Sequence, residues 1–210
     1  MFKKYWKFFV IFWSVVLVGI IGVFVFFWLI SAGKLGFMPT FEELENPNNR
    51  FASEVYFADG PIMNRYFEKE NRKYIEYREI PQSVIDALIA TEDVRFYDHS
   101  GVDVRGLFRV AKGLLTANPS AGGGSTISQQ LAKMLFPRES DLNVFELAIR
   151  KFREWVIAVR LEKSYTKEEI LTMYLNKYDF LNLAVGISSA ADIYFQVPLD
   201  SLKVEQAAML

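Results

Sequence analysis

Hydrophobic and polar positions divide the chain into three parts, and the first of these, from Phe8 to Ile30, is almost wholly apolar and carries no charge. About 20 such residues in an α-helix are enough to cross the hydrocarbon core of a membrane. The segment is therefore predicted to be a single transmembrane helix. A secretory signal peptide is the alternative that Ser31-Ala32-Gly33 keeps open, although its apolar core is normally only about 7–15 residues long.

The second part is polar and rich in turn residues until about residue 52, so we predict a linker. Beyond it, the β-prone runs 53–57 and 63–67 flank Ala58-Asp59-Gly60-Pro61, a turn sequence typical of a β-hairpin. Residues 74–77 are a candidate third strand.

After Pro81 the apolar residues recur three and four positions apart, which is the spacing of amphipathic helices. Thr126 with Gln129, and Thr166 with Glu169, have the spacing of helix capping boxes. The last six residues resemble a helix that lacks a stop signal, so we expect the helical domain to be truncated at its C-terminus. The fold is expected to be mainly α. We divide the chain into a cytoplasmic tail (1–7), a transmembrane helix (8–30), a linker (31–52), a small β region (53–80) and a helical domain (81–210).

Composition excludes several classes of protein. The 24 Lys and Arg residues nearly balance the 25 Asp and Glu residues, so nothing indicates a nucleic-acid surface. There is no cysteine and His99 is the one histidine, which excludes disulfides, thiolate metal sites and histidine clusters. Any metal would need oxygen ligands.

The lysines around the apolar segment predict its orientation. Lys3, Lys4 and Lys7 precede the segment, whereas Lys34 is the one lysine that closely follows it. Because positive charge is retained in the cytoplasm, the N-terminus should lie in the cytoplasm and everything beyond Lys34 on the outer side of the membrane.

Glu92 is the most informative polar position in the helical part. On a helix it falls on the stripe of Ile85, Leu88 and Ile89, one turn beyond Leu88. A carboxylate on an apolar face is partly desolvated, which makes it a better proton acceptor at neutral pH. The alternative is that the helix ends at Thr91 and Glu92 faces water in a loop, and the spacing alone leaves both open.

A glycine run leads into a second group of polar residues. Ser125 and Thr126 stand where backbone N–H groups at a helix N-terminus bind phosphate well, and Gln129, Gln130 and Lys133 follow on one helix face. Together they suit a sugar phosphate. An ordinary flexible loop with a capped helix and a solvated face is equally compatible with the pattern.

A third group lies on the helix expected through residues 145–159. Phe145, Ile149, Phe152, Val156 and Val159 form its apolar stripe, and Arg150, Lys151 and Glu154 gather on the opposite side. Judged alone, this charged group is best explained as a surface ion pair, worth about 0.3–0.5 kcal/mol.

Together these pieces resemble the peptidoglycan glycosyltransferase domain of class A penicillin-binding proteins and of related monofunctional enzymes, from about Ser53 to the end of the chain. The first motif consists of Glu92-Asp93, Phe96, His99 and Gly101. The second consists of Gly124-Ser125-Thr126-Ile127, Gln129-Gln130-Leu131 and Lys133. The third consists of Arg150-Lys151, Glu154, Ala158, Leu161 and Glu162. The fourth consists of Ile170-Leu171, Tyr174-Leu175-Asn176, Gly186, Ala190 and Tyr194-Phe195, and a fifth opens with Glu205, Ala207, Ala208, Met209 and Leu210.

The resemblance implies a lysozyme-like helical domain with a small β-hairpin region, preceded by one transmembrane helix. It implies polymerisation of lipid II into β-1,4-linked glycan strands, with inversion and with release of undecaprenyl pyrophosphate. Glu92 and Glu154 would be the catalytic residues, and Glu92 the general base. Substrate would be bound by Ser125, Thr126, Gln129, Gln130, Lys133, Arg150, Lys151 and Asn176. Asp93, Phe96, His99 and Gly101 would be structural.

The resemblance also implies the surroundings of the site. No organic cofactor is expected, and a divalent cation, Mg²⁺ or Mn²⁺, is an open possibility near Glu154. The partners would be lipid II, the lipid-linked glycan strand, the bacterial cytoplasmic membrane and other cell-wall synthesis proteins, with no nucleic acid.

The chain departs from the family pattern at Met134, where asparagine is usual after the lysine, and at Leu181, where glycine is often found. Arg138 is a candidate counterpart of a phosphate-binding arginine that some members carry. Two other functions compete with synthesis. One glutamate in a helical cleft would also serve a lytic hydrolase or transglycosylase, but the polar and basic groups around residues 125–151 favour a pyrophosphate site. A catalytically idle anchor is disfavoured by the presence of both glutamates.

Overall fold

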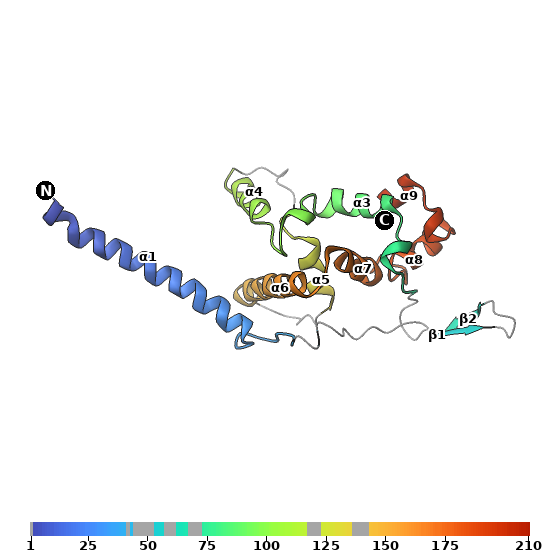
Figure 1. The fold of residues 1–210 in the computed structure, drawn as a ribbon, viewed down its shortest axis with the longest axis horizontal. Helices are drawn as coiled ribbons and strands as arrows, with labels where there is room; N and C mark the ends of the chain where they lie inside the picture. Colours follow the sequence, from blue (N-terminus) through green and yellow to red (C-terminus); the bar gives the residue numbers. More distant parts are fainter. Residues whose placement is uncertain are drawn as a thin grey trace.

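The computed structural model describes residues 2–40, 43, 53–56, 62–66, 73–116, 123–135 and 143–210. Helix α1 (Phe2–Ser31) is one long helix that projects away from the other helices (Figure 1). Its segment Tyr5–Ser31 is long and apolar enough to cross a membrane, and none of its most apolar stretch is buried inside the protein. Length, composition and exposure thus agree with the predicted transmembrane helix.

The predicted hairpin is present. Strands β1 (Ser53–Tyr56) and β2 (Ile62–Tyr66) pair in antiparallel fashion, with Ser53 opposite Tyr66 and an irregularity in register after Val55. The predicted turn at 58–61 lies outside the described residues. In Figure 1 the hairpin stands apart from the helices.

The expected third strand at 74–77 is wrong. Residues 73–76 have no regular secondary structure, and a short 3₁₀ helix, η1 (Tyr77–Glu79), follows them. The reason lies in the partners of the Ile75 backbone. Its N–H donates to Oδ1 of Asn176 at 3.0 Å and its carbonyl accepts from Nδ2 of Asn176 at 2.9 Å. A side chain of a helix therefore takes the place of a strand partner.

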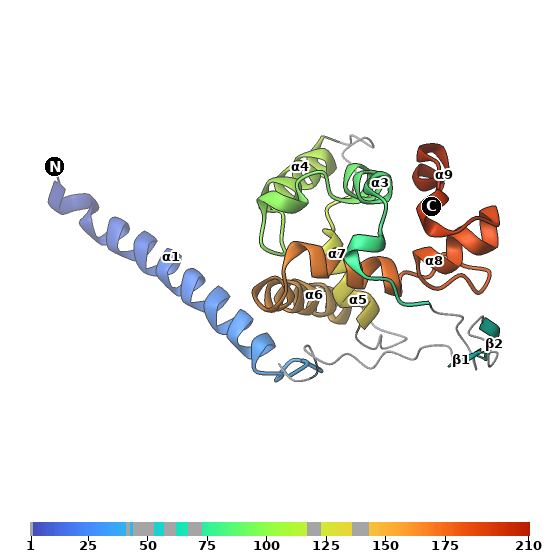
Figure 2. The ribbon, with the colours of Figure 1, turned by 45° about the vertical axis from the view of Figure 1, so that its right-hand side comes forward.

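The remaining described elements form a helical body, as predicted. Their bounds are α3 (Gln82–Glu92), η2 (Phe96–Asp98), α4 (Val104–Leu115), α5 (Ile127–Leu135), α6 (Val144–Ser164), α7 (Lys167–Lys177), α8 (Ile187–Ala190), the π-helical turn η4 (Ala191–Phe195), η5 (Leu199–Ser201) and α9 (Val204–Met209). Helix α5 packs against α6 and α7, and α3 packs against α9 (Figure 2). One buried cluster joins them, with Phe96, Ile127, Leu131, Leu161 and Leu171 among its fully enclosed members.

Capping side chains fix where the helices begin. Thr166 accepts from the Glu169 N–H and Glu169 returns a bond to the Thr166 N–H, so the capping box predicted there is confirmed. The box predicted at Thr126 is half formed, because the Gln129 N–H donates to Thr126 Oγ1 but the Gln129 side chain turns elsewhere. Asn143 and Glu146 form a further capping box at the start of α6, which we did not predict from the sequence.

The prediction for the faces of α6 needs correction. The face that enters the core carries Ile157, Ala158 and Leu161, while Phe145 of the predicted apolar stripe is 71% exposed. Residues three, four and seven positions apart share one side of a helix. Arg150, Lys151 and Glu154 therefore continue the inward face toward the N-terminus of α6 and do not lie opposite it.

The outer stripe of α6 instead meets α1. Phe152 packs edge-on against Phe26 and Phe27 of α1, with ring centroids 5.3 and 5.7 Å apart. About two turns further along α6, Arg160 donates to the backbone carbonyl and to the hydroxyl of Ser31, both at 2.8 Å. Because a cation is favourable at a helix C-terminus, this bond stabilises the end of α1 as well as the contact. The end of the apolar helix is thus docked on the helical body.

Candidate active site

Two cavities meet at Glu92. The larger has a volume of about 490 Å³ and is polar, and its lining includes Ala90, Thr91, Glu92, Asp93, Val94, Arg95, Asp103, Arg109, Gly123, Gly124, Ser125, Thr126 and Gln130. The smaller, of about 70 Å³, lies between α3, α7 and α9 and is lined largely by apolar residues, with Glu92 and Tyr174 at its polar edge. A carboxylate thus stands where a polar and an apolar space adjoin.

Glu92 is the last residue of α3 and its side chain is exposed. The expectation of a desolvated carboxylate is therefore wrong for this structure, because the apolar face of α3 turns inward at Val84 and Ile85 and has left the core by the last turn. One oxygen, Oε2, accepts from Nε2 of Gln130 at 2.6 Å. The carboxylate is held by a neighbour on α5 and not by burial.

Tyr174 completes this small hydrogen-bonded group. Its hydroxyl donates to Oε1 of Gln130 at 3.1 Å, which orients the amide so that its N–H₂ faces Glu92. Burial raises the pKa of the Tyr174 phenol, and the nearby Glu92 carboxylate raises it further. The phenol therefore remains a hydrogen-bond donor throughout the neutral range.

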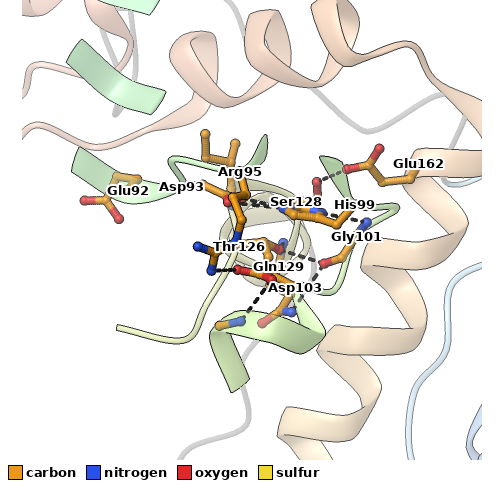
Figure 3. Close-up of polar contacts among 12 residues, drawn as sticks. Glu92, Asp93, Arg95, His99, Gly101, Asp103, Thr126, Ser128, Gln129 and Glu162 are labelled. Atoms are coloured by element: carbon orange, nitrogen blue, oxygen red, sulfur yellow. Dashed lines mark hydrogen bonds and ion pairs between the residues drawn. The ribbon is translucent and has the colours of Figure 1, made fainter. Parts of the chain in front are cut away.

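The next residue, Asp93, turns away from Glu92 into a buried network (Figure 3). Its Oδ2 lies 2.9 Å from Nε2 of His99, and the Gly101 N–H donates to Nδ1 of the same ring at 3.2 Å. Since Nδ1 is an acceptor, the imidazole proton sits on Nε2 and is donated to Asp93. His99 thus joins Asp93 to the Gly101 backbone and fixes the loop after Glu92.

Gly101 is required at its position for two reasons. Its φ of +96° is a conformation that L-residues rarely adopt, and a Cβ there would lie 2.8 Å from backbone atoms of Ala158 and Val159. The loop that follows Glu92 therefore rests backbone to backbone on α6.

The N-terminus of α5 is already occupied. The Ile127 N–H donates to Oδ2 of Asp93 at 3.1 Å, and Thr126 donates its hydroxyl to the Gly101 carbonyl at 2.7 Å. Gln129 is fully buried and donates to the same carbonyl at 3.3 Å. The prediction of a phosphate site at this helix end needs correction, because Asp93 stands where the anion was expected.

Three residues of that predicted group, Ser125, Thr126 and Gln130, still line the polar cavity. Gln130 holds Glu92, and Ser125 lines the polar cavity while its Oγ accepts from Nζ of Lys151 at 2.9 Å. Lys133 is exposed on α5. The shared face expected for these residues is therefore divided, with Gln129 inside and the others outside.

The charged group of α6 is more enclosed than a surface ion pair. Nζ of Lys151 lies 3.0 Å from Oε2 of Glu154, whose side chain is only 12% exposed. Through its second bond, to Ser125, Lys151 joins this pair to the polar cavity. Arg150 is half-buried on the same face of α6. The Lys151 ammonium thus lies next to the wall of the polar cavity that Ser125 forms.

Asn176 has a different position from the one expected of a substrate-binding residue. Its side chain is bonded to the Ile75 backbone and to the Thr172 carbonyl, and it lines neither cavity. Asn176 joins the segment before α3 to α7. Arg138 lies outside the described residues.

No three Asp, Glu or His side chains gather as potential metal ligands within the described residues. The donor set around Glu154 consists of one carboxylate beside a lysine ammonium, which does not fit a divalent cation held by the protein alone.

Three residues of the polar cavity were missed in the sequence. Arg95 forms an ion pair with Asp103, and Arg109 of α4 donates to the Gly123 carbonyl at 3.3 Å. A signal for one of them was present, since Arg105, Arg109 and Lys112 share one face of α4 by their spacing. Arg95 and Asp103 gave none, because their pairing depends on a loop.

The structure thus combines a helical body, a glutamate at the junction of two cavities and an apolar helix docked on that body. The chain belongs to the transglycosylase family, whose model matches residues 59–210.

Named relatives lie within the penicillin-binding proteins. The chain is 37% identical over 173 residues to penicillin-binding protein 1A of Escherichia coli (strain K12), in an alignment that covers 82% of the chain and 20% of that relative. The identity and both coverages are the same for penicillin-binding protein 1A of Pseudomonas aeruginosa. The chain is 36% identical to penicillin-binding protein 1A of Neisseria lactamica, in an alignment that covers 82% of the chain and 21% of that relative. The chain spans about a fifth of the length of these relatives.

Proposed function

We propose that this chain is a peptidoglycan glycosyltransferase that polymerises a lipid-linked disaccharide, lipid II, into β-1,4-linked glycan strands. The observation that carries the proposal is the position of Glu92. Its carboxylate is oriented by Gln130 at the rim of a polar cavity, and that cavity is connected through Ser125 to Lys151 and Glu154. Family membership agrees with this reaction.

In the proposed reaction Glu92 is the general base. It takes the proton of the acceptor sugar's 4-hydroxyl while that oxygen forms a bond to the anomeric carbon of the lipid-linked strand. The bond between the anomeric carbon and the phosphate oxygen breaks, and the electron pair leaves with undecaprenyl pyrophosphate. Attack opposite an α-linked leaving group gives inversion and a β linkage. The bond from Gln130 keeps the basic oxygen oriented before substrate binds.

Charge that develops on the pyrophosphate would be neutralised by Lys151, Arg150 and Lys133. Oriented cations in a partly enclosed site stabilise developing negative charge better than solvated ones. Glu154 would hold the Lys151 ammonium in place at 3.0 Å.

The proposed location follows from α1 and its flanking lysines. Lys3, Lys4 and Lys7 would keep the N-terminus in the cytoplasm, and the helical body would lie outside the bacterial cytoplasmic membrane, where it would meet lipid II and other cell-wall synthesis proteins. If a reporter that works only in the cytoplasm were active when fused after Leu210, this orientation would be contradicted.

The proposal is tested by incubating the protein in detergent with lipid II and separating the products by size. We expect glycan polymer, and we expect Glu92→Gln to lower the rate by about 10²- to 10⁴-fold, because the amide keeps the shape but not the basicity. Glu168→Gln, an exposed glutamate of α7, is the matched control and should keep its rate. Digestion of cell walls in place of polymer formation would indicate a lytic enzyme and overturn the proposal.

A further inference from the structure

The ion pair between Arg95 and Asp103 joins the loop after Glu92 to the start of α4. Nη2 of Arg95 donates to Oδ2 of Asp103, and the two side chains are only 26% and 14% exposed. Both residues line the polar cavity. Figure 3 shows this pair on the opposite side of the buried network from Glu162.

Asp103 also caps α4. Its Oδ1 accepts from the Gly106 N–H at 2.9 Å, and its backbone carbonyl accepts the first helical bond, from Leu107, at 3.0 Å. A Cβ on Gly106 would lie 2.5 Å from Oδ2 of Asp103 and 3.3 Å from Nη2 of Arg95. The ion pair thus lies directly against Gly106, where any larger residue would displace it.

The rest of α4 is packed lightly. Among the α4 residues whose side chains are described, only Gly106 and Gly113 are buried, whereas Phe108 and Leu115 are 73% and 89% exposed. In both ribbon views α4 stands at the margin of the helical body (Figures 1 and 2). Helices with few buried contacts open locally at low free energy, so attachment at one end matters more for α4 than for α5.

Helix α4 brings Arg109 to the polar cavity, on the wall that also contains Gly123 and Gly124. Arg109 donates to the Gly123 carbonyl, and Gly124 lies against Val110 so closely that a Cβ would be 3.2 Å from that side chain. The position of α4 therefore sets both the width of the cavity and the distance between a guanidinium and Glu92.

We propose that Arg95 and Asp103 are positioning residues whose ion pair holds α4 as the wall of the polar cavity, and so controls the binding of the lipid-linked substrate. The inference rests on the proposed function for its substrate. With the pair intact, Arg109 is held at the cavity. With the pair broken, α4 leaves this position and the substrate meets an incomplete site, while Glu92 and Gln130 keep their geometry.

The first measurement is amide hydrogen exchange of the substrate-free protein in detergent. Arg95→Gln removes the charge, and Asp103→Asn keeps an oxygen for the Gly106 N–H but cannot form the ion pair. In each variant we expect exchange in residues 104–115 to become about tenfold faster while α5, α6 and α7 are unchanged, which also shows that the variants fold. In the double variant, amide exchange in residues 104–115 should be no faster than in either single variant. Unchanged exchange in α4, or additive effects, would overturn the proposal.

The second measurement is steady-state polymerisation with lipid II. We expect KM to rise by about fivefold or more with kcat within about twofold, because the chemical group at Glu92 is untouched. Arg95→Lys should recover part of the loss. Arg78→Gln is the matched control, since Arg78 forms an ion pair with Glu76 at 2.8 Å on an exposed surface. A fall in kcat with unchanged KM would overturn the positioning role. Failure of the Glu92 base would leave the exchange result intact, so the two proposals fail separately.

Discussion

Leu181, Asn182 and Leu183 all have positive φ angles, of 69°, 50° and 66°. Asparagine tolerates this left-handed conformation, but leucine adopts it at a cost. The run is held by the Tyr194 hydroxyl, which donates to the Phe180 carbonyl at 2.6 Å and accepts from Asn182 Nδ2 at 3.0 Å. Strain at Leu181 is therefore a local property, stored where the family often has glycine.

Leu181→Gly should stabilise the protein by about 0.5–1 kcal/mol, because relief of the left-handed strain outweighs the added freedom of the unfolded chain. Little packing is lost, since Leu181 is 70% exposed. Denaturant unfolding in detergent measures the change. Leu147→Gly in α6 is the comparison and should destabilise by about 1 kcal/mol. If both variants lost the same amount of unfolding free energy, Leu181 would not be strained.

The two candidate catalytic carboxylates should fail differently. Glu154→Gln weakens the hold on Lys151, so we expect weaker binding of the lipid-linked donor together with a lower rate, whereas Glu92→Gln should affect the rate with binding intact. Donor binding and single-turnover polymerisation are measured separately. If Glu154→Gln lost its rate with normal binding while Glu92→Gln stayed active, the two roles would have to be exchanged.

At the scale of elements, features that depend on neighbouring residues were predicted better from the sequence than features that depend on packing between helices. The capping box of α7 depends on residues three apart and was predicted from Thr166 and Glu169. The exposure of Glu92 was not predicted, because its stripe is apolar on a helical wheel. Only the packing of α3 against α9 decides where α3 leaves the core.

The charged face of α6 shows the same limit. Spacing alone placed Phe145 and Phe152 toward the core, since a large apolar stripe is normally buried. The structure instead places Phe152 against α1 and turns Lys151 inward to Ser125. The sequence holds two apolar faces on this helix, and only the docking of α1 distinguishes them.

Acid should weaken the attachment of α4. Partial burial alone would raise the pKa of Asp103, but hydrogen bonds from Arg95 and from the Gly106 N–H outweigh it and hold this pKa below its ordinary value. A carboxylate with a lowered pKa in the folded state contributes stability above its unfolded pKa of about 3.9, and this contribution is lost as pH falls through the folded value.

The difference in unfolding free energy between the unmodified protein and Asp103→Asn should therefore be constant near neutral pH and shrink below about pH 4. Denaturant titrations at several pH values measure it. A difference that persists unchanged in strong acid would mean that Asp103 contributes by shape and not by charge.

At the scale of the whole molecule, the docking of α1 on α6 links the site to the bilayer itself. The apolar segment of 27 residues is about 40 Å long at about 1.5 Å per residue, which exceeds a hydrocarbon core of about 30 Å. A helix longer than the core tilts. Because Phe152 and Arg160 fasten the end of this helix to the body, any tilt of the anchor also tilts the polar cavity over the membrane surface.

If the chain has the proposed activity, membrane thickness should influence it, and we expect the rate of polymerisation in vesicles to change several-fold between lipids with short and long acyl chains. Arg160→Ala loosens the fastening and should flatten this dependence, while the rate in detergent stays unchanged. A dependence on acyl-chain length that is equally steep in Arg160→Ala would show that the body turns independently of its anchor. If Arg160→Ala does flatten the dependence, the same protein would work at different rates in membrane regions of different thickness, with the surrounding lipid as its regulator.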